Sequence, residues 1–365
     1  MICVKGSEVR ILTISPMYPD ERFPGFGVFV HGLEKEISRN HPVLFIHAVR
    51  TYCAGSKFKR IASYLWWVSR VFMVGLFGRY DVIHAHTVYP AGFLAVLISF
   101  VRRKPVLITV HGSDICLVDS KRSYVKWMTR FAFRRANCVQ VVSQFIKNKV
   151  IDFDASVIKK VFVQSMGVDT RVFFPEESVV QDDDLKLIFV GNLVREKGWK
   201  TAFKAVHLLH KRGVKCTLNV YGDGRDKKTA IEWIKKNKAS QYICLHGAVK
   251  PKAVAKAMRS ANVFIFPSMY EEAFSLVTAE ALASGLPVVV SLKGALPELV
   301  KDKSESCMVE NYEDFEAFAD ACERVIKSKK KLNENPESLL DAANSIWFSS
   351  RKVIGVYKKM LEGEK

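Results

Sequence analysis

The sequence predicts an α/β protein built from two doubly wound parallel-sheet domains. Short β-branched runs alternate with longer helical patterns over residues 9–151, and the same alternation restarts near residue 187 and continues to residue 291. This rhythm indicates parallel strands with helices on both faces of each sheet. The length agrees, because 365 residues suffice for two domains of ordinary size.

Each half contributes five predicted strands. Those of the first half are Val9–Ser15, Pro42–Ala48, Asp81–Ala85, Val106–Val110 and Cys138–Val142, with helices at 27–39, 57–78, 91–103, 121–136 and 144–151. Those of the second half are Leu187–Val190, Thr217–Tyr221, Ile243–Leu245, Val263–Pro267 and Val288–Ser291, with helices at 200–211, 227–236, 252–260 and 278–284.

A polar break separates the halves, with Pro175 and an acidic triplet in FFPEESVVQDDD. We therefore expect one domain over residues 1–178, a second over 179–345, and a C-terminal helix over 346–365 that packs back on the first. Two such domains facing each other leave a central cleft bounded by the carboxyl ends of both sheets. Ligands of open α/β sheets bind at these ends.

Net charge is the unusual feature of an otherwise ordinary globular composition. The chain carries 56 Lys+Arg and 37 Asp+Glu, a net +19. Residues 50–135 alone hold 15 basic and 3 acidic side chains. Such an excess indicates an anionic partner, which could be nucleic acid, a membrane surface or a phosphorylated ligand.

The spacing of the cysteines and the lack of long apolar runs predict a cytoplasmic location. The eight cysteines form no CxxC pair and have no histidine at zinc-finger spacing, as expected of reduced thiols. The first residues lack the pattern of a signal peptide, and no run reaches about 18 uncharged apolar residues.

The densest group of polar residues follows the predicted strand that ends at Pro267, in PSMYEEAFSLVTAE. A helix starting near Ser275 would present free N–H groups suited to a pyrophosphate. Glu272 then lies in the loop before the helix and Glu280 about one turn inside it. A carboxylate can accept two hydrogen bonds from the vicinal hydroxyls of a ribose or another sugar. On spacing alone, a capped surface helix with solvated glutamates is the favoured interpretation.

This block resembles the E-x7-E signature of retaining glycosyltransferases with two Rossmann-like domains, the GT-B architecture. Other segments resemble that family in the same order, and the similarity to teichuronic-acid-type polysaccharide transferases is particularly clear. They are FPGFGVFVHGLEKEI, DVIHAHTVYPAG, VLITVHGSDI, MGVDTRVFFP, LIFVGNLVREKGWKTAFKAV, YGDGRD, LHGAV, ANVFIFPSMYEEAFSLVTAEALASGLPVVVS and GALPELV.

The resemblance implies transfer of a sugar from a nucleotide-diphosphate donor, with retained anomeric configuration and no further cofactor. It assigns Glu280 to the donor ribose and Glu272 to the donor sugar hydroxyls. The N–H groups of Phe274, Ser275 and Leu276 would hold the diphosphate. Lys197 would contact the same diphosphate and stabilise charge on the leaving group. The family often has an arginine where this chain has Asn192, and Arg195 could replace it.

In the first half the resemblance assigns Gly27 to a donor-binding glycine loop before the first helix and His111 to the donor sugar near the reacting carbon. Asp114 follows His111, on the acceptor side, and could orient a basic partner. His84 and His86 point to the same side of their strand. We expect His86 to reach the acceptor side and His84 to pack under a helix.

The sequence shows no DxD pair at a strand end and no set of metal ligands at recognisable spacing. We therefore expect metal-independent chemistry, in which Lys197 and a helix N-terminus replace the cation. No Asp/Glu pair can be placed across the anomeric carbon, so same-face displacement is the preferred mechanism.

The basic region could serve a glycan or lipid-linked acceptor. Trp66, Trp67, Phe72 and Phe77 lie between basic residues in 57–79, and Lys126, Arg130 and Arg134 recur every four residues beside Trp127 and Phe131. Aromatic and basic residues on a helix suit an anionic bilayer surface. A core-packed helix with a solvated basic rim is the alternative.

Three other functions remain open from the sequence. A nucleotide-sugar epimerase of the same architecture would share the donor residues but need no acceptor surface. A nucleic-acid-binding protein would account for the charge, but an RRM or OB pattern is not recognisable, so we expect no nucleic-acid partner. A catalytically idle homologue is disfavoured by the intact Glu272, Glu280, Lys197 and His111.

Overall fold

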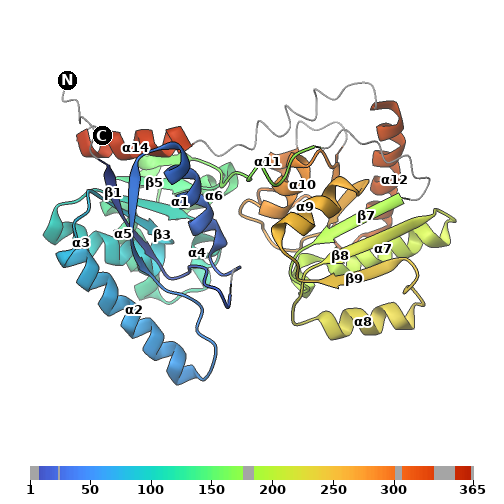
Figure 1. Ribbon diagram of the computed structural model, residues 1–365, viewed down its shortest axis with the longest axis horizontal. Helices are drawn as coiled ribbons and strands as arrows, with labels where there is room; N and C mark the ends of the chain where they lie inside the picture. Colours follow the sequence, from blue (N-terminus) through green and yellow to red (C-terminus); the bar gives the residue numbers. More distant parts are fainter. Residues whose placement is uncertain (1–7, 24, 176–184, 301–305, 333–349, 363–365) are drawn as a thin grey trace. The chain divides into compact units, whose positions relative to one another are not determined.

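A computed structural model describes residues 8–23, 25–175, 185–300, 306–332 and 350–362 (Figure 1). The described residues form two compact units. Unit 1 holds the chain up to Met166 together with the C-terminal helix, and unit 2 begins at Gly167. The boundaries that the sequence pattern placed at residues 178 and 345 lie outside the described residues.

The segment after Met166 belongs to unit 2 because its residues contact that unit. The carbonyl of Val172 accepts a hydrogen bond from Arg259 at 3.1 Å, and the same guanidinium lies 4.5 Å from the ring centre of Phe174.

Unit 1 contains a six-stranded parallel sheet in the order β2-β1-β3-β4-β5-β6. Its strands are β1 (Val9–Ser15), β2 (Val43–Val49), β3 (Val82–His86), β4 (Val106–Val110), β5 (Cys138–Val141) and β6 (Val161–Val163). β3 and β4 are buried along their whole length, as expected of apolar strands covered on both faces.

The helices of unit 1 cover both faces of this sheet. α2 (Lys57–Phe77), α3 (Phe93–Arg102) and α5 (Ser123–Arg135) pack side by side over one face, and α1 (Val28–Asn40) with α14 (Ser350–Glu362) covers the other (Figure 1). The remaining segments are η1 (Val88–Gly92), α4 (Ser113–Cys116), η2 (Val118–Ser120), α6 (Gln144–Phe153) and η3 (Ala155–Lys160).

Unit 2 contains a second six-stranded parallel sheet, in the order β12-β11-β10-β7-β8-β9. Its strands are β7 (Leu185–Val190), β8 (Cys216–Tyr221), β9 (Ile243–Gly247), β10 (Val263–Phe266), β11 (Val288–Ser291) and β12 (Cys307–Val309). Its helices are η4 (Arg195–Lys197), α7 (Trp199–Lys211), α8 (Lys227–Lys236), α9 (Pro251–Arg259), α10 (Leu276–Ala283), α11 (Leu296–Val300) and α12 (Phe315–Leu332).

The predicted pair of doubly wound α/β domains is confirmed. The sequence pattern missed β6 and β12, which are three-residue strands at sheet edges with only one buried residue each. So short and weakly buried a run carries little periodic signal.

Both sheets reverse their direction of winding once. Unit 1 does so between β1 and β3, and unit 2 between β7 and β10. At such a switch point, the loops that follow the two strands diverge and leave room for a ligand. The polar residues that follow β1, β3, β7 and β10 are therefore the first candidates for a site. Among the helices that the structure describes, none is long and apolar enough to cross a membrane.

Candidate active site

An ion pair lies at the switch point of unit 2. Lys197 Nζ, at the end of the loop that follows β7, lies 2.7 Å from Glu272 Oε1 in the loop that follows β10. Ser268 Oγ donates to the same carboxylate oxygen at 2.6 Å. In the part of the chain that the structure describes, the second oxygen, Oε2, accepts no hydrogen bond. The pair therefore presents a fixed carboxylate with one oxygen available.

Two glycines allow these loops to approach. Gly198 has φ +76°, and a Cβ there would lie 1.8 Å from the carbonyl oxygen of Pro267. Gly294 has φ +58°, and a Cβ there would lie 2.4 Å from the carbonyl oxygen of Glu272. That carbonyl also accepts a hydrogen bond from Ala295 N–H at 2.7 Å. Close backbone packing therefore holds Glu272 in place from two sides.

The N-terminus of α10 follows directly. Its first helical residue is Leu276, and Ser275 precedes it with φ +62°. The Ser275 hydroxyl pairs with the Thr278 hydroxyl at 2.8 Å and does not cap the helix. Phe274 and Ser275 are buried, so they fix the backbone at this point. The first N–H groups of α10 thus have no side-chain cap and are suited to an anion.

Glu280 lies on α10, four residues after Leu276. Burial raises the pKa of its carboxyl group from the usual 4.5 to about 8, so the group is mostly protonated at pH 7. A buried carboxyl group of this kind gains a hydrogen-bonding partner when a hydroxyl-bearing ligand binds. The sequence-predicted residues Lys197, Glu272, Phe274, Ser275, Leu276 and Glu280 thus belong to the neighbouring loops and helix at this switch point.

Arg195 is exposed, and it lies in η4 beside Glu196. The arginine that pairs with Glu196 is Arg225, which follows β8. The loops that follow β7 and β8 lie close together, since a Cβ on Gly222 would lie 1.9 Å from the carbonyl oxygen of Gly191. Arg225 belongs to the YGDGRD segment, in which the sequence alone predicts no role for it. Arg225 is therefore a further basic residue near this edge of the sheet.

Three histidines gather at the carboxyl ends of β3 and β4 in unit 1. His86 Nδ1 and His111 Nε2 lie 3.1 Å apart, and the rings of His84 and His86 are tilted against each other with centroids 4.2 Å apart. Burial lowers the pKa of His111 to about 3 and that of His86 well below its usual value, so both rings are neutral at pH 7. His86 Nε2 and His111 Nδ1 are buried without a partner among the described residues.

His84 is tied to the C-terminal helix. Its Nδ1 lies 2.7 Å from the hydroxyl of Tyr357 on α14, and its Nε2 lies 2.7 Å from Thr109 Oγ1. The expected packing of His84 under a helix is therefore what the structure shows, with α14 as the helix. Tyr357 lies 273 residues away, so sequence reasoning had no signal for this contact.

Asp114 interacts with backbone and not with a basic side chain. Its two oxygens accept hydrogen bonds from Val88 N–H at 3.0 Å and Gly112 N–H at 2.9 Å. These bonds tie together the segments that follow β3 and β4. The expectation that Asp114 orients a basic partner is wrong, because both oxygens point toward backbone donors. Asp114 instead positions the loop that begins at His111.

Gly27 precedes α1 with φ +73°, and a Cβ there would lie 2.5 Å from the backbone of Met17. The glycine is thus required by the loop that follows β1. α1 has no side-chain cap at this end, which leaves its first N–H groups available.

The basic side chains that recur every four residues on α5 interact with other residues of unit 1. Arg134 pairs with Asp154 at 2.7 Å, Arg130 lies 4.5 Å from the ring centre of Phe153, and Lys126 lies 3.7 Å from Asp119. These residues therefore stabilise the tertiary structure of unit 1, and we do not assign them to membrane binding.

α2 differs from α5. Trp67 is buried and donates its indole N–H to the carbonyl of Ala48 at 2.9 Å, whereas Trp66 and Phe77 are 62% and 76% exposed. Of the sequence alternatives for residues 57–79, the core-packed helix therefore describes only one face of α2.

No group of three or more His, Cys, Asp or Glu side chains in the described ranges could hold a metal ion. At the unit 2 switch point, Lys197 and the N-terminus of α10 provide positive charge close to Glu272.

Two doubly wound sheets, each with polar residues at its switch point, define the two-domain α/β class of GT-B architecture. Two family models match the chain. The model described as Glycosyltransferase Family 4 matches residues 5–172, and the one described as Glycosyl transferases group 1 matches residues 171–338. The matches adjoin and cover both sheets, so the chain belongs to these glycosyltransferases. The family resemblance drawn from the motifs is confirmed.

Individual relatives agree. The uncharacterized glycosyltransferase MJ1607 of Methanocaldococcus jannaschii is 28% identical over 246 residues, 62% of each chain. TuaC of Bacillus subtilis, described as a teichuronic acid biosynthesis glycosyltransferase, is 26% identical over 256 residues, 65% of this chain and 61% of TuaC. The chain thus spans under two thirds of the length of these relatives. The structure of HepE from Anabaena with UDP and glucose aligns with a TM-score of 0.73 at 17% identity, covering 98% of this chain and all of HepE.

Proposed function

We propose that the protein is a retaining glycosyltransferase that moves a sugar from a nucleotide-diphosphate donor to a glycan or lipid-linked acceptor in cell-surface polysaccharide or glycolipid synthesis. The observation that carries the proposal is the Lys197–Glu272 pair beside the uncapped N-terminus of α10. A cation and free N–H groups suit a diphosphate, and a fixed carboxylate suits sugar hydroxyls. HepE, which shares the fold, binds UDP and glucose.

The proposed donor site assigns one task to each group. Lys197 and the N–H groups at the start of α10 hold the diphosphate and stabilise the charge that develops on it as it leaves. Glu272 Oε2 accepts hydrogen bonds from the donor sugar. Glu280 accepts hydrogen bonds from the ribose hydroxyls, and these bonds lower its raised pKa when the donor binds. Arg195 and Arg225 supply further positive charge at this edge of the sheet.

In unit 1, we assign His111 to the donor sugar and His86 to the acceptor side. Because both rings are neutral at pH 7, they act as hydrogen-bonding groups and not as cations. Asp114 and Gly27 set the backbone of the loops that follow β4 and β1.

The mechanism we propose is same-face displacement. The bond from the anomeric carbon to the diphosphate oxygen breaks as the acceptor oxygen bonds to that carbon on the same face, and the acceptor proton passes to the leaving phosphate. The anomeric configuration of the product, read by NMR, tests retention. Trapping a kinetically competent glycosyl adduct on Glu272 would contradict the mechanism.

Metal independence follows from giving Lys197 and α10 the electrostatic role of a cation. Activity in excess EDTA should equal activity with added Mg²⁺ or Mn²⁺. A loss above tenfold in EDTA that is restored by one of these ions would overturn this part of the proposal.

A thermal-shift panel of UDP-, GDP- and ADP-sugars tests donor binding, because a ligand that binds the folded state raises its melting temperature. One donor should stabilise the protein, and Lys197→Met should abolish the shift. If no nucleotide sugar does so, the proposed function is wrong. Donor consumption with and without a membrane extract separates the transferase from a nucleotide-sugar epimerase, which needs no acceptor.

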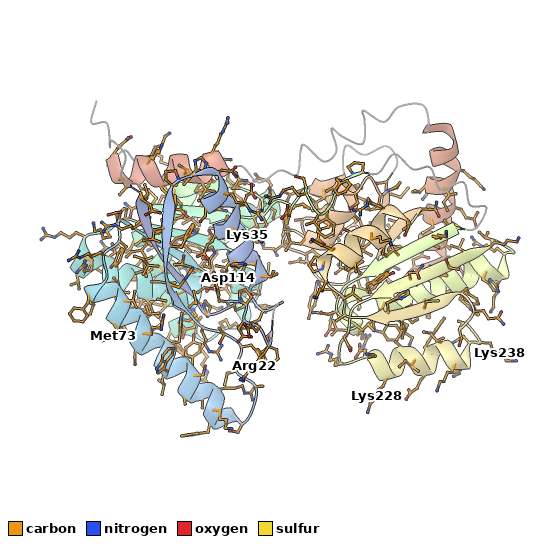
Figure 2. The ribbon with its side chains drawn as sticks, in the orientation of Figure 1. Arg22, Lys35, Met73, Asp114, Lys228 and Lys238 are labelled. Carbon is orange, nitrogen blue, oxygen red and sulfur yellow. The ribbon has the colours of Figure 1, made fainter. Side chains whose placement is uncertain are left out.

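We further propose that the protein works in the cytoplasm, docked peripherally on the inner membrane face through the outward stripe of α2. We define this stripe as Trp66, Arg70, Met73 and Phe77, which share one helix face by their spacing. Trp66, Met73 and Phe77 are 62%, 63% and 76% exposed. Figure 2 shows Met73 directed away from the body of unit 1.

Exposed aromatic and basic residues on one helix face favour an anionic bilayer. Trp66→Ser/Phe77→Ser should abolish flotation with phosphatidylglycerol vesicles at low salt. Unchanged flotation would refute the docking surface.

A further inference from the structure

A shallow hollow of about 370 Å³ lies on unit 1 at the amino-terminal end of α2. Three basic and three largely apolar side chains line it. They are Arg50, Lys57, Arg60, Ile61, Tyr64 and Leu65. None of these residues belongs to the proposed donor site or to the outward stripe of α2.

The hollow lies at the carboxyl edge of the unit 1 sheet. Arg50 directly follows β2, and its N–H donates to the carbonyl of Ser15, the last residue of β1, at 2.9 Å. Burial raises the pKa of Tyr64 to about 12, and the Tyr89 hydroxyl, in the segment that follows β3, adds a smaller part of the rise. Because parallel strands end at one edge of a sheet, the hollow lies at the same edge as the end of β3, where His86 is the last residue.

The basic wall of the hollow is partly pre-organised and lacks counter-charges. Arg50 Nε donates to Ser63 Oγ at 3.3 Å, and its guanidinium lies 5.5 Å from the ring centre of Tyr64. Within the described part of the chain, no carboxylate forms an ion pair with Arg50, Lys57 or Arg60. Three cations around one hollow suit a multiply charged anion such as a phosphate or diphosphate.

The other wall of the hollow is apolar. Ile61 and Leu65 are 50% and 62% exposed, and with Lys57 they are spaced four residues apart on one side of α2. This side differs from the outward stripe of Trp66, Met73 and Phe77. A ligand that fills the hollow thus meets positive charge at one end and hydrocarbon along its length.

We propose that this hollow binds the phosphate end of a single-chain lipid phosphate or diphosphate, with the first carbons of the chain over Ile61 and Leu65. This rests on the proposed function, and it identifies the acceptor class as one that carries its sugar on such a phosphate. Bulk bilayer headgroups share the phosphate chemistry, but they would meet the outward stripe, whereas this hollow lies at the edge where the strand ends are.

Calorimetric titration of the whole protein with geranyl diphosphate tests the proposal, with inorganic pyrophosphate and geraniol as partial ligands. Geranyl diphosphate should bind at least tenfold more tightly than either. Lys57→Gln/Arg60→Gln should weaken its binding at least tenfold. The matched pair Lys59→Gln/Arg79→Gln removes the same charge outside the hollow and should leave binding within twofold. Equal effects of the two pairs, or equal binding of pyrophosphate, would overturn the proposal.

Phosphatidylglycerol vesicles distinguish the two phosphate sources. The Lys57→Gln/Arg60→Gln protein should still bind them, whereas Trp66→Ser/Phe77→Ser should not. If the hollow variant lost vesicle binding and kept geranyl diphosphate binding, the hollow would be a headgroup site and the proposal wrong. No nucleotide enters these titrations, so they can fail or succeed independently of the donor panel.

Discussion

Replacing Glu280 with glutamine should make the protein more stable at neutral and alkaline pH. The pKa of this carboxyl group is about 8 in the folded protein against the usual 4.5. Because the pKa is higher in the folded state, the folded protein keeps its full stability below pH 4.5, where Glu280 is protonated in both states. It loses part of that stability as the pH rises through 8. Glutamine keeps the shape and never ionises, so Glu280→Gln avoids this loss.

The magnitude follows from the size of the shift. Each unit of pKa shift corresponds to about 1.4 kcal/mol, so the full shift would be worth roughly 5 kcal/mol between pH 4.5 and pH 8. Part of the Glu280 surface reaches solvent, and we therefore expect about 2 kcal/mol.

Urea unfolding of both proteins at pH 5, 6, 7 and 8 provides the assay. The free energy of unfolding of the Glu280→Gln protein should exceed that of the wild type by an amount that grows with pH. A difference that changes by less than about 0.5 kcal/mol between pH 5 and pH 8 would refute the reasoning, because it would show that Glu280 titrates normally.

Three further predictions concern the unit 2 switch point and the histidine cluster of unit 1. Gly198→Ala should lower the free energy of unfolding in urea by about 3 kcal/mol, because the added Cβ would overlap the carbonyl oxygen of Pro267. The control Gly213→Ala has a similar φ of +81° but open space around the Cβ, and it should lower this free energy by about 1 kcal/mol. Equal losses would contradict the close approach at Gly198. Lys197→Met should lower kcat about 100-fold while the exposed control Lys200→Met does not, and equal rates would exclude Lys197 from the leaving-group role. His111, with a pKa of about 3, should show no NMR titration between pH 5 and pH 8, and a midpoint in that range would contradict its burial.

Sequence reasoning succeeded where function depends on the ends of strands. Lys197 and Glu272 are 75 residues apart, yet each follows a strand that its own apolar run predicts, and parallel strands end at one edge. It failed for Asp114, because a loop carboxylate can accept from a basic side chain or from backbone N–H groups with equal ease. Only the path of the loop decides, and here it brings Val88 and Gly112 to the carboxylate.

The basic excess of residues 50–135 shows why charge alone does not define a binding surface. Arg134 is neutralised by Asp154 at 2.7 Å, and Arg102 donates to the carbonyls of Leu76 and Gly78 at 2.6 and 3.0 Å, so these charges mainly hold helices together. Lys57 and Arg60 have the same formal charge but line a hollow without a carboxylate partner in the described ranges. A surface cation that holds two helices together is directed away from a ligand, whereas an unpaired one that lines a hollow can turn toward an anion that enters it. Within the basic region 50–135, Lys57 and Arg60 therefore remain available to the anion that we propose for the hollow at the amino-terminal end of α2.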